Sequence, residues 1–370
     1  GSAALGGTTT VIPFVAQHRG DDLAAIAKEY HALAARGAIV DYTFHLIVTT
    51  PDEKTLKEDL PALARDGHGS IKVFMTYDPM RLHDEEMLDV LLKARELGAL
   101  VCVHAENHGM IKWMVSRLLE RGHTAPKFHA VSHPRVSEAE AFTRLIAMSE
   151  LLDQPVMIFH VSTAEAVAEI RAARARGAPV WAETCPHYLF QTEDVLDRPG
   201  LEGAKWMCSP PQRGPADRDA LWAALGRGDL ALVSSDHAPY AMDESGKLAA
   251  GPDAPFPEIA NGQPGLQQRL PVLFDAMVTR GRLGARAFVA ATATAPARLY
   301  GLAGKGDIAP GGDADLVIWA PGRAVTYGAA DMADDATLVQ RLRDEGDAFA
   351  KVGCLITLEN HFRLAPSELA

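Results

Sequence analysis

The stretch Val101-Cys102-Val103-His104-Ala105-Glu106-Asn107 joins a short apolar run to a histidine, an acid and an amide. In three other stretches a short apolar run also carries an ionisable side chain: residues 70–74 with Lys72, 156–162 with His160, and 232–239 with Asp236. Short apolar runs that alternate with helical segments are typical of parallel βα units, whose carboxyl strand ends meet at one mouth. We therefore expect these four polar side chains to lie close together.

Strand and helix patterns alternate over the first 300 residues. Helical apolar spacing predicts helices, among others, over residues 22–36, 84–97 and 137–152, and residues 129–134 are predicted to be a loop. The predicted strands number seven: 8–14, 42–48, those carrying Lys72, His104 and His160, 179–184, and 230–235. This pattern predicts an α/β fold with a TIM-like (β/α)8 barrel. Seven strands are one fewer than closure needs, so we expect the first strand to be absent from the chain.

The character of the sequence changes after the last predicted strand. Residues 238–259 are rich in Gly, Pro and Asp, which indicates an active-site loop. Turn residues at 304–315 then lead into a predicted strand at 316–319. We expect a barrel over residues 1–300, a remnant of a small β domain over 301–325, and an unassigned segment over 326–370 that contains a helix at 336–350 and a strand at 354–358.

Composition limits the classes of partner. The chain is 48% hydrophobic, enough for a large core, and its net charge of -12 argues against nucleic acid and anionic membranes. No apolar run is long enough to cross a membrane, and no signal peptide is visible. The four cysteines are scattered without metal-site spacing. Reduced thiols, and hence a cytoplasmic location, are the expectation.

Two imidazoles and a carboxylate at the mouth of one barrel indicate a metal site. A lone histidine after a strand is more often a hydrogen-bonded core residue, but zinc accepts this combination of ligands. Lys72 has two possible roles in such a site. It is either a structural lysine at the rim, or a carbamate formed with carbon dioxide, whose two oxygens can bridge two metal ions.

The ordered motifs resemble those of dihydropyrimidinases and D-hydantoinases, which are cyclic amidohydrolases of the amidohydrolase superfamily. The resemblance covers roughly residues 6–319. It rests on residues 6–10, 70–77, 103–107, 160–162, 183–189, 208–211, 234–239 and 261–265. It implies hydrolytic ring opening of a dihydropyrimidine or 5-substituted hydantoin to an N-carbamoyl amino acid, in a homo-oligomer, either a dimer or a tetramer.

The resemblance also implies a ligand set. Carboxylated Lys72 would bridge two zinc ions, with His104 and His160 on one ion and Asp236 on the other. Asp236 would act as general base and then as general acid.

Three further residues have roles implied by the resemblance. Tyr77 would hydrogen-bond the developing oxyanion. The backbone groups of Ser209 and Asn261 would hold the cyclic amide.

One family feature is missing from this sequence, since it contains no His-x-His, the pair that supplies two ligands to the ion shared with Asp236. Three explanations stay open: an incompletely represented hydrolase, a divergent member that uses fewer metal ions, or a non-catalytic assembly protein. Other cyclic amidohydrolases, of the allantoinase or dihydroorotase type, are the alternative within the class. We expect one strong metal site and a weak one at Asp236, with His361 as the first replacement ligand to consider.

The remaining histidines are not expected to bind metal. His237 is expected to support its neighbours rather than to ligate. His108, His129, His133 and His187 lie in predicted loops or helices without ligand spacing, and His45, in the middle of a predicted strand, is expected to be structural.

Overall fold

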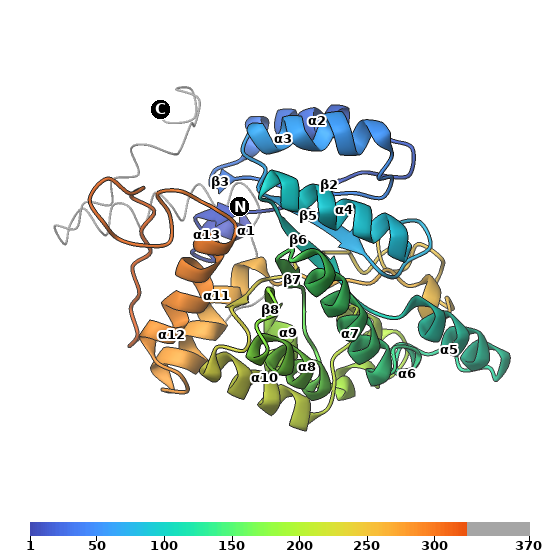
Figure 1. The fold of residues 1–370 in the computed structure, drawn as a ribbon. Helices are drawn as coiled ribbons and strands as arrows, with labels where there is room; N and C mark the ends of the chain where they lie inside the picture. The colour runs from blue at the N-terminus through green and yellow to red at the C-terminus, as the bar shows by residue number, and fades with distance from the viewer. Residues whose placement is uncertain (324–370) are drawn as a thin grey trace.

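A sheet of seven parallel strands forms the centre of the protein in this computed structural model, which describes residues 1–323 (Figure 1). Its strands pair in chain order, so each βα unit adds one strand beside the previous one. The sheet is curled, as in a partial (β/α)8 barrel, and the predicted fold class is confirmed. The strands are β2 (Phe14–Ala16), β4 (His45–Ile47), β5 (Ser70–Phe74), β6 (Leu100–His104), β7 (Val156–Ile158), β8 (Val180–Thr184) and β9 (Leu232–Val233).

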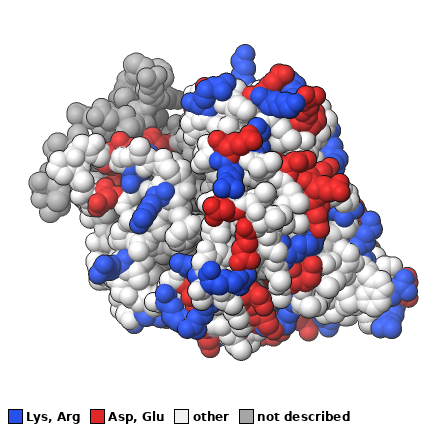
Figure 2. All heavy atoms as spheres, in the orientation of Figure 1, with Lys and Arg blue, Asp and Glu red and all other residues white. Residues whose placement is uncertain are grey.

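Helices cover the outer face of the sheet. Four of them, α4 (Asp84–Leu97), α7 (Arg135–Leu152), α8 (Ala164–Ala175) and α10 (Pro215–Arg227), lie side by side along it. Acidic and basic side chains are interspersed over the helices on the face drawn in Figure 2. The other α-helices of the described residues are α1 (Ser2–Leu5), α2 (Leu23–Gly37), α3 (Leu60–Arg65), α5 (His108–Glu120), α6 (Phe128–Ser132), α9 (Pro186–Phe190), α11 (Leu266–Phe274), α12 (Ala285–Val289) and α13 (Ala295–Leu299).

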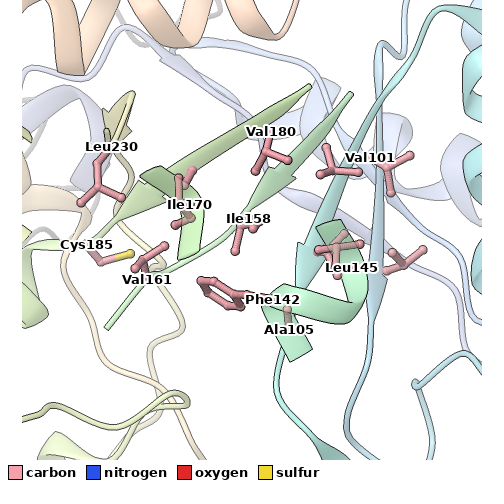
Figure 3. Packing of buried hydrophobic residues seen from close by; sticks show 14 of the residues in the cluster. Val101, Ala105, Phe142, Leu145, Ile158, Val161, Ile170, Val180, Cys185 and Leu230 are labelled. Atoms are coloured by element: carbon pink, nitrogen blue, oxygen red, sulfur yellow. The ribbon is translucent and has the colours of Figure 1, made fainter. Parts of the chain in front are cut away.

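Alternation along the strands produces two apolar layers. On β6, Val101 and Val103 belong to the large cluster between sheet and helices, while Leu100 and Cys102 belong to a smaller inner cluster. Figure 3 shows the outer layer, in which Val101 and Ile158 of the sheet pack near Leu145 of α7. Because side chains alternate with period two, β6 also directs His104 to the inner side.

The same alternation places Lys72 inside the curl. Its neighbours Ile71 and Val73 are in the outer layer, so the lysine between them faces the interior. Register pairs Lys72 with Cys102 and Phe74 with His104. Two of the predicted metal ligands are therefore on the same side of adjacent strands.

Several predicted elements differ from the structure. The predicted strand at 8–14 is two strands, β1 (Thr10–Val11) and β2, which belong to different sheets, and β1 pairs with β3 (Asp41–Tyr42). The predicted loop at 129–134 contains most of α6. Helix α10 was not predicted, because its apolar residues give only a weak helical pattern among alanines and charges.

The predicted strand at 316–319 is wrong. Residues 313–320 contain no regular secondary structure. Trp319 instead stacks on Phe274 of α11, with ring centroids 4.1 Å apart, while Leu316 and Ile318 remain exposed. Trp319 is only partly buried, so this apolar run contacts α11 through one indole ring and does not pair as a strand. The predicted helix at 336–350, the predicted strand at 354–358 and His361 lie outside the described residues.

None of the helices in the described part of the chain is long and apolar enough to cross a membrane.

Candidate metal centre and substrate site

Lys72 is buried in an aromatic cage. Its side chain is 2% exposed, and its Nζ lies 4.2 Å from the ring centroid of Phe159 and 4.7 Å from that of Phe74. Within residues 1–323 no carboxylate is within ion-pair distance of it. Burial lowers the pKa of the amine to about 8, and the charge of Asp236 offsets part of this shift. A substantial fraction of Lys72 is therefore neutral in mildly alkaline solution, the form that reacts with carbon dioxide.

His104 ends β6 and is held by a buried acid. Its Nε2 is 2.8 Å from Oε2 of Glu106, which leaves Nδ1 free of that contact. The His104 and His160 rings lie with centroids 4.4 Å apart. The structure therefore brings two predicted ligands together, although they come from strands whose sequences are more than fifty residues apart.

Backbone conformation singles out three predicted site residues. Besides Asp153, which ends α7, the non-glycine residues with positive φ among those described are Tyr77 (73°), His160 (44°) and Asp236 (42°). Each follows the carboxyl end of a strand. Such conformations cost free energy and cluster at functional sites. The positive φ values therefore point to the same end of the sheet as the residue types do.

Partial or complete removal from water shifts the pKa values of both His160 and Asp236, although Asp236 is the more exposed of the two. His160 is 4% exposed, and its buried Nδ1 has no hydrogen-bond partner. Burial holds the pKa of His160 well below its usual range, which favours the neutral, ligating imidazole. Asp236 is partly accessible to solvent. Its surroundings nevertheless raise the pKa of its carboxyl group, and the charge of Lys72 offsets part of the rise.

Tyr77, Ser209 and Asn261 border the same mouth. The Tyr77 ring lies 5.0 Å from that of His104. Burial raises the pKa of its phenol above the ordinary value, and a hydrogen bond with the Ser209 side chain offsets part of the rise. Gly262 N donates to Met207 O (2.9 Å), which joins the Asn261 segment to the Ser209 segment. Oδ1 of Asn261 is buried without a partner.

The donor set fits a divalent metal ion such as zinc. The fit rests on the neutral imidazoles of His104 and His160, the partnerless Nδ1 of His160, and an amine that burial makes reactive. A second candidate cluster among the described residues, Asp41, Asp313 and Asp315, surrounds the ammonium of Lys305. That lysine is 2.8 Å from Asp313 and 2.7 Å from Asp315, so a cation already occupies this cluster.

Sequence reasoning missed the residues behind the ligands. The sequence prediction gives Glu106 no role of its own and expects His129 and His133 not to bind metal. Glu106 Oε1 is 2.8 Å from His133 Nδ1, and His129 Nε2 is 2.8 Å from Cys208 O, next to Ser209. An acid two residues after His104 is a usable signal for Glu106, whereas only the fold brings His133 to it. His237, expected to support its neighbours, accepts from Gly265 N at 3.0 Å.

The chain matches the Amidohydrolase family over residues 2–340. It is 40% identical to the D-hydantoinase of Streptomyces coelicolor over 322 residues, which cover 86% of this chain and 68% of that protein. It is 36% identical to a D-phenylhydantoinase of Escherichia coli over 323 residues, again 86% of this chain and 68% of the relative.

Solved structures agree with these sequence matches. The D-hydantoinase (dihydropyrimidinase) of a Thermus species superposes with a TM-score of 0.81 at 35% identity, covering 85% of this chain and 68% of the other. The dihydropyrimidinase of Brevibacillus agri gives a TM-score of 0.81 at 39% identity with the same coverage.

Proposed function

Because this chain belongs to the amidohydrolase family, we propose that it is a hydrolase that opens a cyclic amide or imide ring. The proposed substrates are a dihydropyrimidine or a 5-substituted hydantoin, and the product is an N-carbamoyl amino acid. Relatives named D-hydantoinase and D-phenylhydantoinase support this substrate class. One observation carries the proposal. The rings of His104 and His160 lie with centroids 4.4 Å apart, close to Lys72 and Asp236.

We propose zinc as the cofactor. Lys72, as its carbamate, would hold it with His104 and His160, and Asp236 would contribute to a second ion. The metal would supply a water of lowered pKa and polarise the amide carbonyl.

The chain's own residues would then move protons and hold the ring. Asp236 takes a proton from the attacking water and delivers it to the ring nitrogen that leaves, a role suited to a carboxyl group of raised pKa. Tyr77 stays protonated because its pKa is raised, so its hydroxyl can donate to the carbonyl oxygen as negative charge develops. Ser209 and Asn261 hold the ring beside these groups.

The test is an assay of ring opening with dihydrouracil and 5-phenylhydantoin in the presence of zinc. Asp236→Asn should lower kcat by about 10²–10⁴-fold, because the amide cannot accept the proton. Its circular dichroism spectrum should remain that of the wild type. Absence of turnover in zinc-loaded wild-type protein, with allantoin and dihydroorotate also inert, would refute the proposed activity.

We also propose a homo-oligomer, a dimer or tetramer, located in the cytoplasm. The three described cysteines, Cys102, Cys185 and Cys208, are buried and free, which is compatible with a reducing compartment. Light scattering of the purified protein measures the oligomeric state.

A further inference from the structure

Glu106 is a fully buried acid beside the candidate metal centre. Its side chain is 0% exposed, yet none of the described lysines or arginines forms an ion pair with it. Its partners are two imidazoles, Nε2 of His104 and Nδ1 of His133, each at 2.8 Å. A buried carboxylate needs such donors, because an unpaired charge inside a protein is costly.

The carboxylate determines which nitrogen of each ring carries the proton. A carboxylate only accepts hydrogen bonds, and each oxygen of Glu106 lies 2.8 Å from a ring nitrogen, one of His104 and one of His133. His104 must therefore donate from Nε2–H. In a neutral imidazole the other nitrogen, Nδ1, then has the free lone pair that a metal ion requires.

His133 is fixed in turn from its other sides. Its backbone carbonyl accepts from Nη1 of Arg213 at 2.6 Å, and its ring packs against that of His129 with centroids 4.5 Å apart. His129 Nε2 lies 2.8 Å from Cys208 O and 3.2 Å from Ser209 Oγ. A continuous buried series thus runs from His104 through Glu106 and His133 to the segment of Ser209.

We propose that Glu106 and His133 are positioning residues, which fix the tautomer and ring orientation of His104 so that its Nδ1 faces the metal. This inference rests on the proposed function, because it assumes that His104 is a ligand. Loss of an acid that orients a metal-bound histidine typically weakens metal affinity by about 10–100-fold.

The test compares zinc affinity, measured by competition with a chromophoric chelator, in the wild type and two variants. Glu106→Gln should weaken zinc binding about 10–100-fold, because an amide cannot accept from both imidazoles. Glu106→Asp keeps the charge but is one methylene too short to span both rings, so it should also weaken binding. Wild-type zinc affinity in Glu106→Gln would overturn the positioning role. Wild-type zinc affinity in Glu106→Asp would overturn it as well.

Asp217→Asn is the matched control. Asp217 is also a buried acid, 3% exposed, but it accepts from Ala164 N at 2.9 Å and from Arg135 rather than from a predicted ligand. We expect its zinc affinity to equal that of the wild type. A loss equal to that of Glu106→Gln would show a general effect of buried acids and would overturn the inference.

Nitrogen NMR of the imidazoles in metal-free wild type gives a second measurement that needs no variant. We expect the His104 proton on Nε2, and a proton on Nδ1 would overturn the inference. Neither measurement uses substrate. Failure of the wild type to open rings would therefore count against the proposed function and not against this role of Glu106.

Discussion

The buried side chain of Lys72 contributes little to the stability of the fold, which favours a functional role for it. A charged amine surrounded by the rings of Phe14, Phe74 and Phe159 gains little for the fold, because desolvation of an ammonium offsets the cation–π contacts. A buried lysine with a lowered pKa is therefore more typical of a functional site than of a structural core.

Replacement of Lys72 by methionine should therefore preserve folding and abolish metal binding. Methionine is similar in length and apolar, so we expect the free energy of unfolding to change by less than about 1.5 kcal/mol. Zinc content should fall to the background level, and ring opening should fall with it. Urea denaturation and elemental analysis check the two parts. Full zinc content in Lys72→Met would contradict the assignment of Lys72 as a ligand.

Tyr77 should contribute to the transition state more than to binding. We expect Tyr77→Phe to lower kcat by about 10²–10³-fold with little change in KM, because the phenol donor serves the developing oxyanion. Steady-state kinetics with 5-phenylhydantoin measure both constants. A raised KM with unchanged kcat would assign Tyr77 to substrate binding instead.

The predicted ligands and their supporting residues differ in how far sequence reveals them. Lys72 lies within an apolar run and His104 at the end of one, so strand periodicity alone places both on the inner face of the sheet. The partner of Glu106, His133, is separated from it by α5 and α6, and no local pattern reports a contact across two helices. Residues that position ligands through tertiary contacts therefore escaped prediction.

At the scale of elements, helix ends follow local rules. Helix α4 ends at Gly98 with φ 67°, a left-handed conformation that favours glycine, whereas α2 ends with Gly37 in helical geometry. A Cβ added at either position would meet nothing within 4 Å. The two glycines therefore differ in backbone conformation and not in available space.

This pair gives a prediction with an internal control. Gly98→Ala should destabilise the protein by about 1 kcal/mol, because a left-handed conformation strains an L-residue. Gly37→Ala should instead stabilise it by about 0.4–1 kcal/mol through lower entropy of the unfolded chain. Urea denaturation of both variants measures the difference. Changes of the same sign would contradict the backbone explanation.

Elements were predicted best where both periodicity and end signals were present. The ends of α4 agree with the prediction because three acids begin it and Gly98 ends it. Composition predicts one strand over residues 8–14, because it does not show that the chain changes sheet at Pro13, between β1 and β2. Pairing partners decide such cases, and they are far away in sequence.

At the scale of the whole molecule, buried histidines make stability depend on pH. Burial lowers the pKa values of His45 and His187 to about 3. Between about pH 6.5 and 3 the unfolded chain therefore binds protons that the folded chain does not. Their contribution to stability is complete above about pH 6.5 and is lost as pH falls. Glu183, whose pKa burial raises to about 8, acts in the opposite direction, so single variants are needed to separate the effects.

His187→Gln isolates one of these contributions. Between pH 7 and pH 5 the wild type should lose about 2 kcal/mol more stability than this variant, because one proton linked to unfolding is removed. Urea denaturation with a chelator in all samples measures the loss. The exposed His18→Gln variant is the control and should follow the wild type. Equal acid sensitivity of His187→Gln and the wild type would show that folding does not lower the pKa of His187.

Metal content tests the whole arrangement at once. Lys72 on β5, His104 on β6 and His160 just after β7 form a set at three neighbouring strands, while Asp236, which follows β9, is the other predicted ligand. Affinity increases with ligand number and preorganisation, so we expect one zinc ion per chain to remain after dialysis and a second to be lost first. Elemental analysis before and after dialysis decides this. About two tightly held ions would require further ligands for the Asp236 ion, and Asp236→Asn would then release one of them.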